Sequence, residues 1–206
     1  MYNPSVEILF ETEPPRSVSG EPGPFRKADY LALPEEPRCE LLWGHLVVTP
    51  SPASRHQFVL LALSACLRDF ALTHGHALLF APMDVTLFEH SVLQPDLLLI
   101  DRSRREILED RVEGPPDLVV EILSPSSVWR DRMVKLALYA KAGAPEYWIV
   151  DSEARTIELL ALEGDSYRVV VAEGGRFSSR RFPALSLDLE ALWDEIDRAS
   201  TGRLPG

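Results

Sequence analysis

The segment from residue 115 to residue 151 constrains the fold of this chain more than any other part of the sequence. It opens with PPDLVVEIL, a short apolar run of the kind that a largely buried strand produces. The serine-rich turn 124–127 supplies a cap for a helix over 128–143, and Pro145 stops that helix. YWIVD (147–151) follows as a second buried strand. The order strand, helix, strand predicts a βαβ unit in a parallel or mixed sheet.

Other segments predict further strands and helices around this unit. HALLFA, DVTLF and DLLLI are expected to be core strands. A hairpin is expected over 40–48, with Gly44 in its turn, and a long helix over 51–75. A second hairpin over 156–172 and an acidic helix over 187–199 complete the pattern. The predicted fold class is therefore α/β, with a mixed central sheet flanked by helices.

The length of 206 residues, 46% of them hydrophobic, suits one substantial core rather than two. Residues 1–24 contain five prolines and little apolar periodicity, so we expect an extended, proline-rich arm there. Residues 25–199 are expected to form a single domain, and residues 200–206 a tail.

The net charge of −11 excludes a general nucleic-acid coat protein, because affinity for the phosphate backbone comes largely from lysine and arginine. The charge does not exclude a nuclease, because carboxylates that hold a divalent cation are part of the same negative balance. No apolar run is long enough for a membrane helix, and the first residues carry acids where a signal peptide carries basic residues, so a cytoplasmic location is expected.

Two acids and a lysine form the group most typical of a chemical site. Asp96 opens the strand DLLLI, and Glu121 lies within the apolar strand that follows. The next helix places Asp131, Lys135 and Tyr139 at a spacing of four, along one stripe. Two alternatives remain open: Glu121 pairs with an arginine or caps a neighbouring helix, or the helical stripe is a solvated face. Two acids and a lysine are also the minimum set for metal-assisted hydrolysis of a phosphodiester.

Three blocks of the sequence resemble a known family. They are YLALPEEPRCELLWGHLVVTPSPASRHQFV, QPDLLLI and PPDLVVEILSPSSVWRDRMVKLALYAKAGAPEYWIVD, in this order and spacing. Over roughly residues 26–172 the chain is similar to the putative restriction endonucleases of the PD-(D/E)XK nuclease superfamily. The resemblance implies a restriction-endonuclease-like fold.

The resemblance also assigns expected roles to single residues. Asp96 matches the Asp of the "PD" element, Glu121 the acid of the "(D/E)XK" element, and Glu40 an acid from the N-terminal element. The strand position that usually carries the superfamily lysine is apolar here, and Lys135 on the next helix looks like its replacement. His56 matches a histidine at the start of the long helix.

Further residues are expected to support this site. Tyr139 and Asp131 share the helical stripe of Lys135. Asp117 repeats the dipeptide that precedes Asp96 and competes with it for the "PD" position; we prefer Asp96, because this fold usually takes its two acids from adjacent strands. Basic residues near the proposed site are weaker candidates for DNA phosphate contacts: Arg102, Arg105, Arg130 and Arg132.

The function expected from these observations is a DNA endonuclease that depends on Mg²⁺ or Mn²⁺, with Asp96 and Glu121 as metal ligands. The expected acting form is a homodimer or higher homo-oligomer, with the arm able to wrap a second subunit. The competing interpretation is a catalytically silent module that keeps the nuclease fold and binds nucleic acid or protein. The apolar residue at the strand lysine position and the acidic net charge favour that interpretation.

Overall fold

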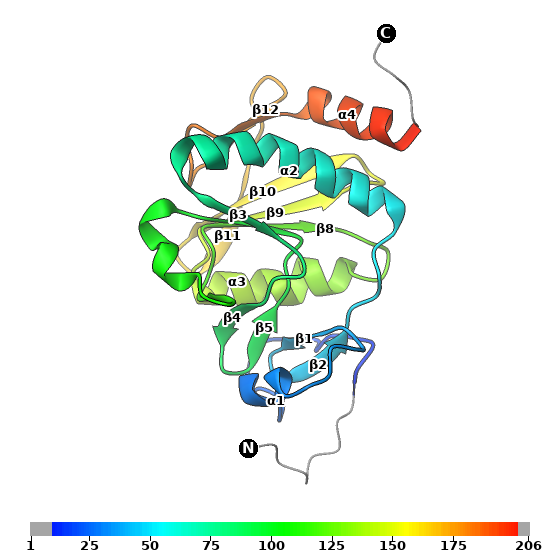
Figure 1. The fold of residues 1–206 in the computed structure, drawn as a ribbon, viewed down its shortest axis with the longest axis vertical. Helices are drawn as coiled ribbons and strands as arrows, with labels where there is room; N and C mark the ends of the chain where they lie inside the picture. The colour runs from blue at the N-terminus through cyan, green and yellow to red at the C-terminus, as the bar shows by residue number, and fades with distance from the viewer. Residues whose placement is uncertain (1–9, 202–206) are drawn as a thin grey trace.

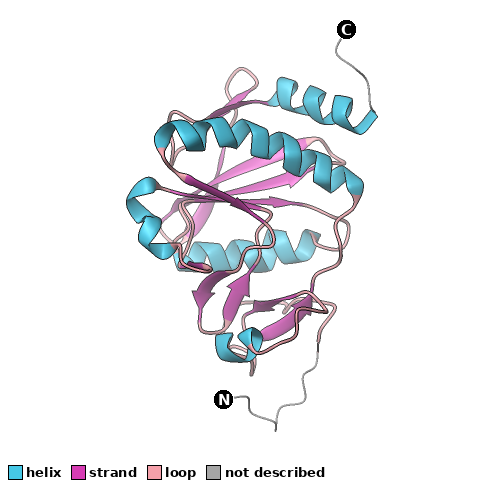
Figure 2. Ribbon diagram, viewed as in Figure 1, coloured by secondary structure: helices cyan, strands magenta, loops and turns pink. Residues whose placement is uncertain are grey.

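The computed structural model describes residues 10–201 (Figure 1). Residues 1–9 of the expected arm and residues 202–206 of the expected tail lie outside the described residues. The described residues contain both helices and strands, which Figure 2 colours separately, and their strands form three sheets. No helix among residues 10–201 is long and apolar enough to cross a membrane.

A six-stranded mixed sheet forms the centre of the fold. Its strand order is β11-β10-β9-β8-β6-β3, and β8 and β9 run parallel while the other pairs are antiparallel. The strands are β3 Ala77–Phe80, β6 Leu97–Ile100, β8 Leu118–Ile122, β9 Glu146–Asp151, β10 Thr156–Glu163 and β11 Ser166–Val170. The predicted βαβ unit and the predicted α/β class with a mixed sheet are confirmed.

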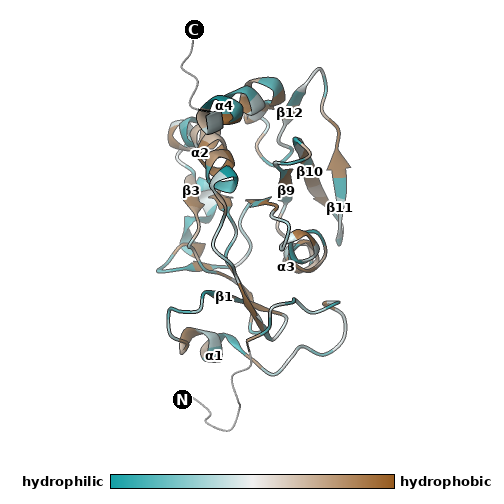
Figure 3. Cartoon of the chain, turned by 90° about the vertical axis from the view of Figure 1, so that its right-hand side faces the viewer, coloured by the Kyte–Doolittle hydropathy of each residue, from teal (hydrophilic) through white to brown (hydrophobic). Residues whose placement is uncertain are grey.

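Helices cover both faces of this sheet. Helices α2 Ser54–His74 and α4 Leu189–Thr201 pack on one face, and α3 Leu136–Ala142 packs on the other (Figure 1). Alternate residues of β8 pack on opposite faces of the sheet, because neighbouring side chains of a strand point in opposite directions. Val120 packs on the α2 side and Val119 on the α3 side. Figure 3 shows the hydrophobic residues concentrated in the strands between the helices.

A five-stranded sheet lies beyond α3, toward the N-terminal end of the described chain. Its order is β2-β1-β5-β4-β7, made by β1 Cys39–Leu42, β2 His45–Val48, β4 Val85–Phe88, β5 Ser91–Leu93 and β7 Val112–Glu113. The predicted hairpin over 40–48 is confirmed, and both turn residues have positive φ: 51° at Trp43 and 82° at Gly44. The prediction that DVTLF joins the central sheet was wrong, because β4 turns back onto β5 and pairs within this second sheet.

Residues 10–24 precede the β1–β2 hairpin in the sequence and run alongside it, without forming a helix or strand of their own. Glu11 pairs with β2 through two backbone hydrogen bonds, Glu11 N–H to Leu46 O (2.7 Å) and Val48 N–H to Glu11 O (2.9 Å). Gly23 N–H donates to Trp43 O at 2.9 Å. A Cβ on Gly44 would lie 2.4 Å from Gly23 O, so the described part of this segment packs closely on the hairpin turn.

The helix after β8 begins with an irregular turn that matters for the site. Residues Arg130–Lys135 (η2) form a π-helix, which continues directly into α3. A π-helical stretch brings residues four apart closer to alignment than an α-helix does, and such stretches occur frequently at functional sites. The smaller elements are α1 Lys27–Leu31, the 3₁₀ helix η1 Arg102–Ile107, β12 Arg176–Ser178 and β13 Ser186–Asp188.

Candidate functional site

A cavity of about 420 Å³ opens where β6 and β8 meet the start of α2 and the π-helix η2. Its lining includes half of the residues that the sequence singles out. These are His56, Asp96, Glu121, Arg130, Asp131 and Lys135, and Arg38 and Gln94 line it as well.

Asp96 and Glu121 come from adjacent strands. Strands β6 and β8 are antiparallel, with Leu97 opposite Val120, so Asp96 lies beside Glu121 across the strand pair. Asp96 is held at both oxygens: Oδ2 accepts the backbone N–H of Ile122 at 2.7 Å, and His56 Nε2 lies 3.2 Å from Oδ1. These contacts fix the orientation of the Asp96 carboxylate at the cavity wall.

Lys135 joins two acids that are far apart in the sequence. Its Nζ lies 2.9 Å from Glu121 Oε1 and 2.9 Å from Glu40 Oε1, and 3.8 Å from Asp131 Oδ1. Lys135 is only 2% exposed, and Glu40 is fully buried. The π-helix turns both Asp131 and Lys135 inward, so neither lies on a solvated face. The two open alternatives for Glu121 and for the helical stripe are therefore not what the geometry shows.

Glu40 and Asp131 have a further cationic neighbour in Arg130. Its Nε lies 3.3 Å from Asp131 Oδ1 and 3.7 Å from Glu40 Oε2. Glu40 Oε1 also accepts the backbone N–H of Gln94 at 2.7 Å, whereas Glu40 Oε2 is buried without a hydrogen-bond partner among residues 10–201. The sequence did not single out Gln94, and its only signal is its place just before Pro95–Asp96.

The charges of this cluster do not balance. Four carboxylates face two cations, which leaves an excess of two negative charges before any contribution from His56. The members are Glu40, Asp96, Glu121, Asp131, Arg130 and Lys135. An excess of buried negative charge is unfavourable unless protons or a cation neutralise it.

Burial and the neighbouring charges together shift the pKa values in this cluster. Burial raises the pKa of Glu121 well above its usual range, Lys135 opposes that shift, and the neighbouring acids add to it. Burial alone would lower the pKa of Lys135, but Glu121, Glu40 and Asp131 outweigh it and raise the pKa, so the ammonium stays charged. Burial likewise raises the pKa of Asp131, against the opposing effects of Lys135 and Arg130.

The donor set fits a divalent cation of the Mg²⁺ type. Within the described residues, no three His, Cys, Asp or Glu side chains converge as a complete metal cage. Mg²⁺ does not need one, because it usually binds through one or two carboxylates and takes its other ligands from water and substrate phosphate. Asp96 and Glu121 supply two such carboxylates at the cavity wall, and Glu121 Oε2 makes no hydrogen bond within residues 10–201.

Tyr139 lies deeper than the cavity. It is fully buried, and its hydroxyl has no hydrogen-bond partner in the described part of the chain. Burial raises the pKa of Tyr139 well above its usual range, and the nearby carboxylates of Glu121 and Glu40 add to the shift. The phenol therefore stays protonated behind the two acids that Lys135 joins.

Asp117 does not join the cluster. Its carboxylate is 1% exposed and pairs with Arg181 (Oδ1 to Nη2, 2.9 Å) and Arg104 (3.2 Å), and Oδ2 accepts the backbone N–H of Asp101 at 2.8 Å. Asp117 precedes β8 and Glu121 lies near its other end, so a shared strand face does not bring the two carboxylates together. The structure thus corrects the grouping of Asp117 with the site.

The arginines proposed to contact DNA phosphates are also not brought together. Arg102 and Arg105 lie on η1 beside His76, to which they bond through the Arg102 backbone N–H and the Arg105 guanidinium. Arg132 pairs with Glu158 at 2.6 Å, and Arg130 is buried inside the acid cluster. These four positions do not form one continuous basic track.

A solved structure shows the same fold, and a family model identifies the family. A crystal structure of a putative nuclease belonging to DUF820 from Anabaena variabilis superposes with a TM-score of 0.71; it is 20% identical, and the match covers 84% of this chain and 99% of that one. A search of curated proteins finds no match. The model of the Uma2 family, described as "putative restriction endonuclease", matches residues 28–190. Because that match spans most of the sequence, the chain belongs to the Uma2 family of putative restriction endonucleases.

Proposed function

We propose that this chain is an endonuclease that hydrolyses phosphodiester bonds of DNA with the help of Mg²⁺ or Mn²⁺. The observation that carries the proposal is the buried ammonium of Lys135 between Glu40 and Glu121, beside Asp96 in one cavity. Perturbed titratable groups that converge in a cavity are characteristic of catalytic sites. Membership of a family of putative restriction endonucleases supports the same reaction.

Asp96 and Glu121 are the proposed metal ligands. The backbone N–H of Ile122 and the His56 ring hold the Asp96 carboxylate, so it needs little reorganisation to bind a cation. Bound there, a divalent cation supplies Lewis-acid polarisation of the phosphate and activation of the attacking water. His56 is a positioning residue in this scheme, because it acts through Asp96.

Lys135 provides the fixed positive charge of the site. Its Nζ is anchored by two carboxylates at 2.9 Å, so the side chain is held in place before substrate binds. A preorganised ammonium can orient the attacking water or stabilise the charge that develops on the phosphate. Lys135 reaches this position from η2, whereas the strand position two residues after Glu121 is occupied by the buried Leu123. Glu40 supports the arrangement by holding Lys135 from the other side.

Cleavage of supercoiled plasmid DNA tests the proposal. The wild type should cut with Mg²⁺ or Mn²⁺ and stop in EDTA, and Glu121→Ala and Lys135→Ala should each lose at least about 100-fold in rate. Lys141→Ala is the matched control, because Lys141 lies on the same continuous helix but is exposed, with its Nζ 3.9 Å from the Trp43 ring centroid. Its cleavage rate should stay within about twofold of the wild type.

A catalytically silent binding module is the second candidate, favoured by the apolar strand position at Leu123. Absence of cleavage by the wild type with either metal, on plasmid and on single-stranded DNA and RNA, would establish it instead. The proposal also includes a homodimer as the acting form and the cytoplasm as its compartment. Sedimentation that shows only monomer at micromolar concentration would remove the homodimer.

A further inference from the structure

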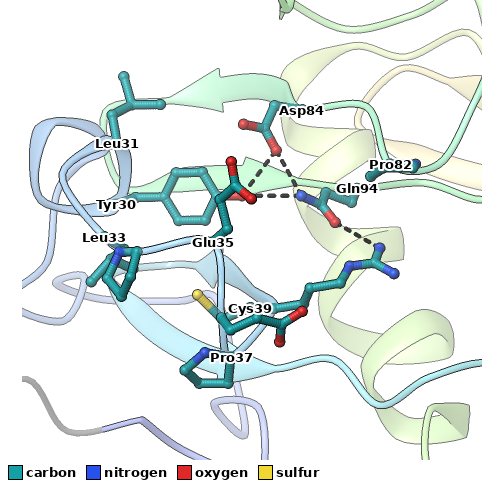
Figure 4. Close-up of a pocket in the computed structure, with 12 residues that line it drawn as sticks. Tyr30, Leu31, Leu33, Glu35, Pro37, Cys39, Pro82, Asp84 and Gln94 are labelled. Atoms are coloured by element: carbon teal, nitrogen blue, oxygen red, sulfur yellow. Dashed lines mark hydrogen bonds between the residues drawn. The ribbon is translucent and has the colours of Figure 1, made fainter.

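A second pocket, of about 400 Å³, lies next to the candidate active site (Figure 4). It is formed between the loop that precedes β1 and the ends of β4 and β5. Two residues, Arg38 and Gln94, line both this pocket and the cavity that holds Asp96 and Glu121. The two spaces therefore share one wall, formed by Arg38 and Gln94.

Four side chains in the second pocket are joined by hydrogen bonds whose donors and acceptors are all defined. Gln94 Oε1 accepts from the Arg38 guanidinium at 3.1 Å, so its Nε2 points the other way. That Nε2 donates to Asp84 Oδ1 at 2.9 Å and to the Tyr30 hydroxyl at 3.2 Å, and Tyr30 in turn donates to Asp84 Oδ1 at 2.9 Å. Figure 4 shows these side chains converging from three segments of the chain.

This arrangement leaves one acceptor free. Asp84 Oδ1 takes two hydrogen bonds, while Oδ2 has no hydrogen-bond partner within residues 10–201. The Gln94 amide and the Tyr30 hydroxyl both donate to Asp84. Burial raises the pKa of Tyr30, and the negative charge of Asp84 raises it further, so the hydroxyl keeps the proton that it donates. The pocket therefore offers a fixed carboxylate oxygen to a ligand that brings a hydrogen-bond donor.

The walls of the pocket combine apolar and acidic side chains. Leu31, Leu33, Pro34, Pro37, Cys39 and Pro82 supply the apolar part, and Glu35 and Glu36 also line the pocket. Burial, with the charge of Glu40, raises the pKa of the Cys39 thiol to about 11, so it lines the wall in its neutral form. Apolar walls with a few convergent polar groups are the usual form of a small-molecule site, and they suit a flat ring with a polar edge.

We propose that this pocket binds a nucleobase that carries an exocyclic amino group, turned out of the nucleic acid whose phosphodiester occupies the neighbouring cavity. The inference rests on the proposed nuclease function. Enzymes that read a base out of the stack hold it between apolar side chains and hydrogen-bond its Watson–Crick edge. The base would donate its amino N–H to Asp84 Oδ2, and Arg38, at the shared wall, would face the connecting sugar and phosphate.

The acceptor at Asp84 separates the bases into two groups. Adenine, cytosine and guanine each bear an amino group that can donate to a carboxylate. Thymine and uracil have no amino group, and their single Watson–Crick donor, N3–H, lies between two carbonyl oxygens that a carboxylate repels. A site that accepts a hydrogen bond from an amino group therefore discriminates against a base that can donate only by bringing carbonyl oxygens close to the carboxylate. The pocket therefore predicts a preference for amino-bearing bases at one position of the substrate.

Titration of the whole chain with deoxynucleoside monophosphates, followed by calorimetry or ligand-observed NMR in EDTA, tests the proposal without any cleavage step. The wild type should bind dGMP, dCMP or dAMP at least about tenfold more tightly than dTMP. Asp84→Asn should remove that preference, because an amide puts a donor where the free acceptor was. Asp165→Asn, which removes an equal charge from an exposed turn far along the chain from this pocket, should leave the preference unchanged.

Three results would overturn the proposal: dTMP binding as tightly as the others, no binding by any of the four, or an unchanged preference in Asp84→Asn. The comparison among nucleotides uses the unmodified protein, so it remains decisive even where Asp84→Asn does not fold. Failure of the nuclease proposal looks different, because plasmid would stay uncut while the base preference in EDTA persisted. The experiments can therefore refute the nuclease proposal and the base-binding proposal independently.

Discussion

Replacing Lys135 with methionine removes the ammonium that joins two buried acids while keeping most of the side-chain volume. Lys135 is 2% exposed and makes charged contacts of 2.9 Å with both Glu40 and Glu121. A charged hydrogen bond contributes about 1.5–3 kcal/mol, and breaking a buried pair from one side costs about 3–5 kcal/mol. Uptake of a proton by Glu121, whose pKa burial already raises, offsets part of that loss.

We therefore expect Lys135→Met to lower the free energy of unfolding by about 3–5 kcal/mol at pH 8, close to the range for a buried pair broken from one side. For a chain of this size each kcal/mol corresponds to about 2–4 °C in Tm, so the transition should fall by roughly 6–20 °C. Urea unfolding followed by circular dichroism measures the difference. The matched substitution is Lys141→Met, which loses only an exposed cation–π contact of about 0.5–1 kcal/mol. A loss in Lys135→Met no larger than that of Lys141→Met would refute the reasoning, because the ammonium would then not be holding the buried acids.

Three further predictions test other parts of the structure. Burial lowers the pKa of His76, whose Nδ1 accepts the Arg102 backbone N–H, so the unfolded chain takes up this proton more readily. Stability should therefore fall as the pH drops below about 6.5, and His76→Asn should show a smaller fall between pH 7.5 and 5.5 in urea titrations. Asp117→Asn breaks buried ion pairs and should cost about 3–5 kcal/mol at pH 8, yet plasmid cleavage below Tm should be unchanged; a matching loss of cleavage would return Asp117 to the site. Gly44→Ala should destabilise more than Gly164→Ala, since both have positive φ but only the first Cβ meets backbone, at 2.4 Å; equal melting temperatures would contradict the packing of residues 10–24.

The sequence was sufficient to predict the central part of the fold, because the signals there are local. The apolar run before Glu121, the serine-rich turn and Pro145 define a strand, a helix and a strand within one short segment. The hairpin around Gly44 is equally local, since a two-residue turn with positive φ at both positions needs a glycine or a similar residue. The family resemblance rested on the same segments and is confirmed by the family match.

The parts that were not predicted depend on contacts between distant residues. Nothing in the helix periodicity distinguishes a π-helix from an α-helix over Arg130–Lys135, although the spacing of four already placed Asp131 and Lys135 on one face. Asp117 is removed from the site by Arg181, which lies 64 positions away in the sequence. Gln94 carries no chemical signal of its own, and its importance comes from the two pockets that it separates.

The arrangement also explains how an acidic protein can hold a charged lysine at the proposed catalytic site. Desolvation opposes a buried ammonium, but the carboxylates of Glu121, Glu40 and Asp131 outweigh it. The same carboxylates leave the cluster with excess negative charge, which favours binding of a cation. On this account, the negative charges near Lys135 both keep it protonated and attract the metal.

The most direct test of the central claim is a Mn²⁺ titration followed by electron paramagnetic resonance, in which bound Mn²⁺ loses the signal of the free ion. It compares two aspartates that each follow a proline: Asp96→Asn at the cavity and Asp117→Asn in the distant ion pairs. The account predicts that the wild type and Asp117→Asn bind Mn²⁺ equally, and that Asp96→Asn binds it at least about tenfold more weakly. No binding by the wild type, or an equal loss in both variants, would contradict a metal centre at Asp96 and Glu121.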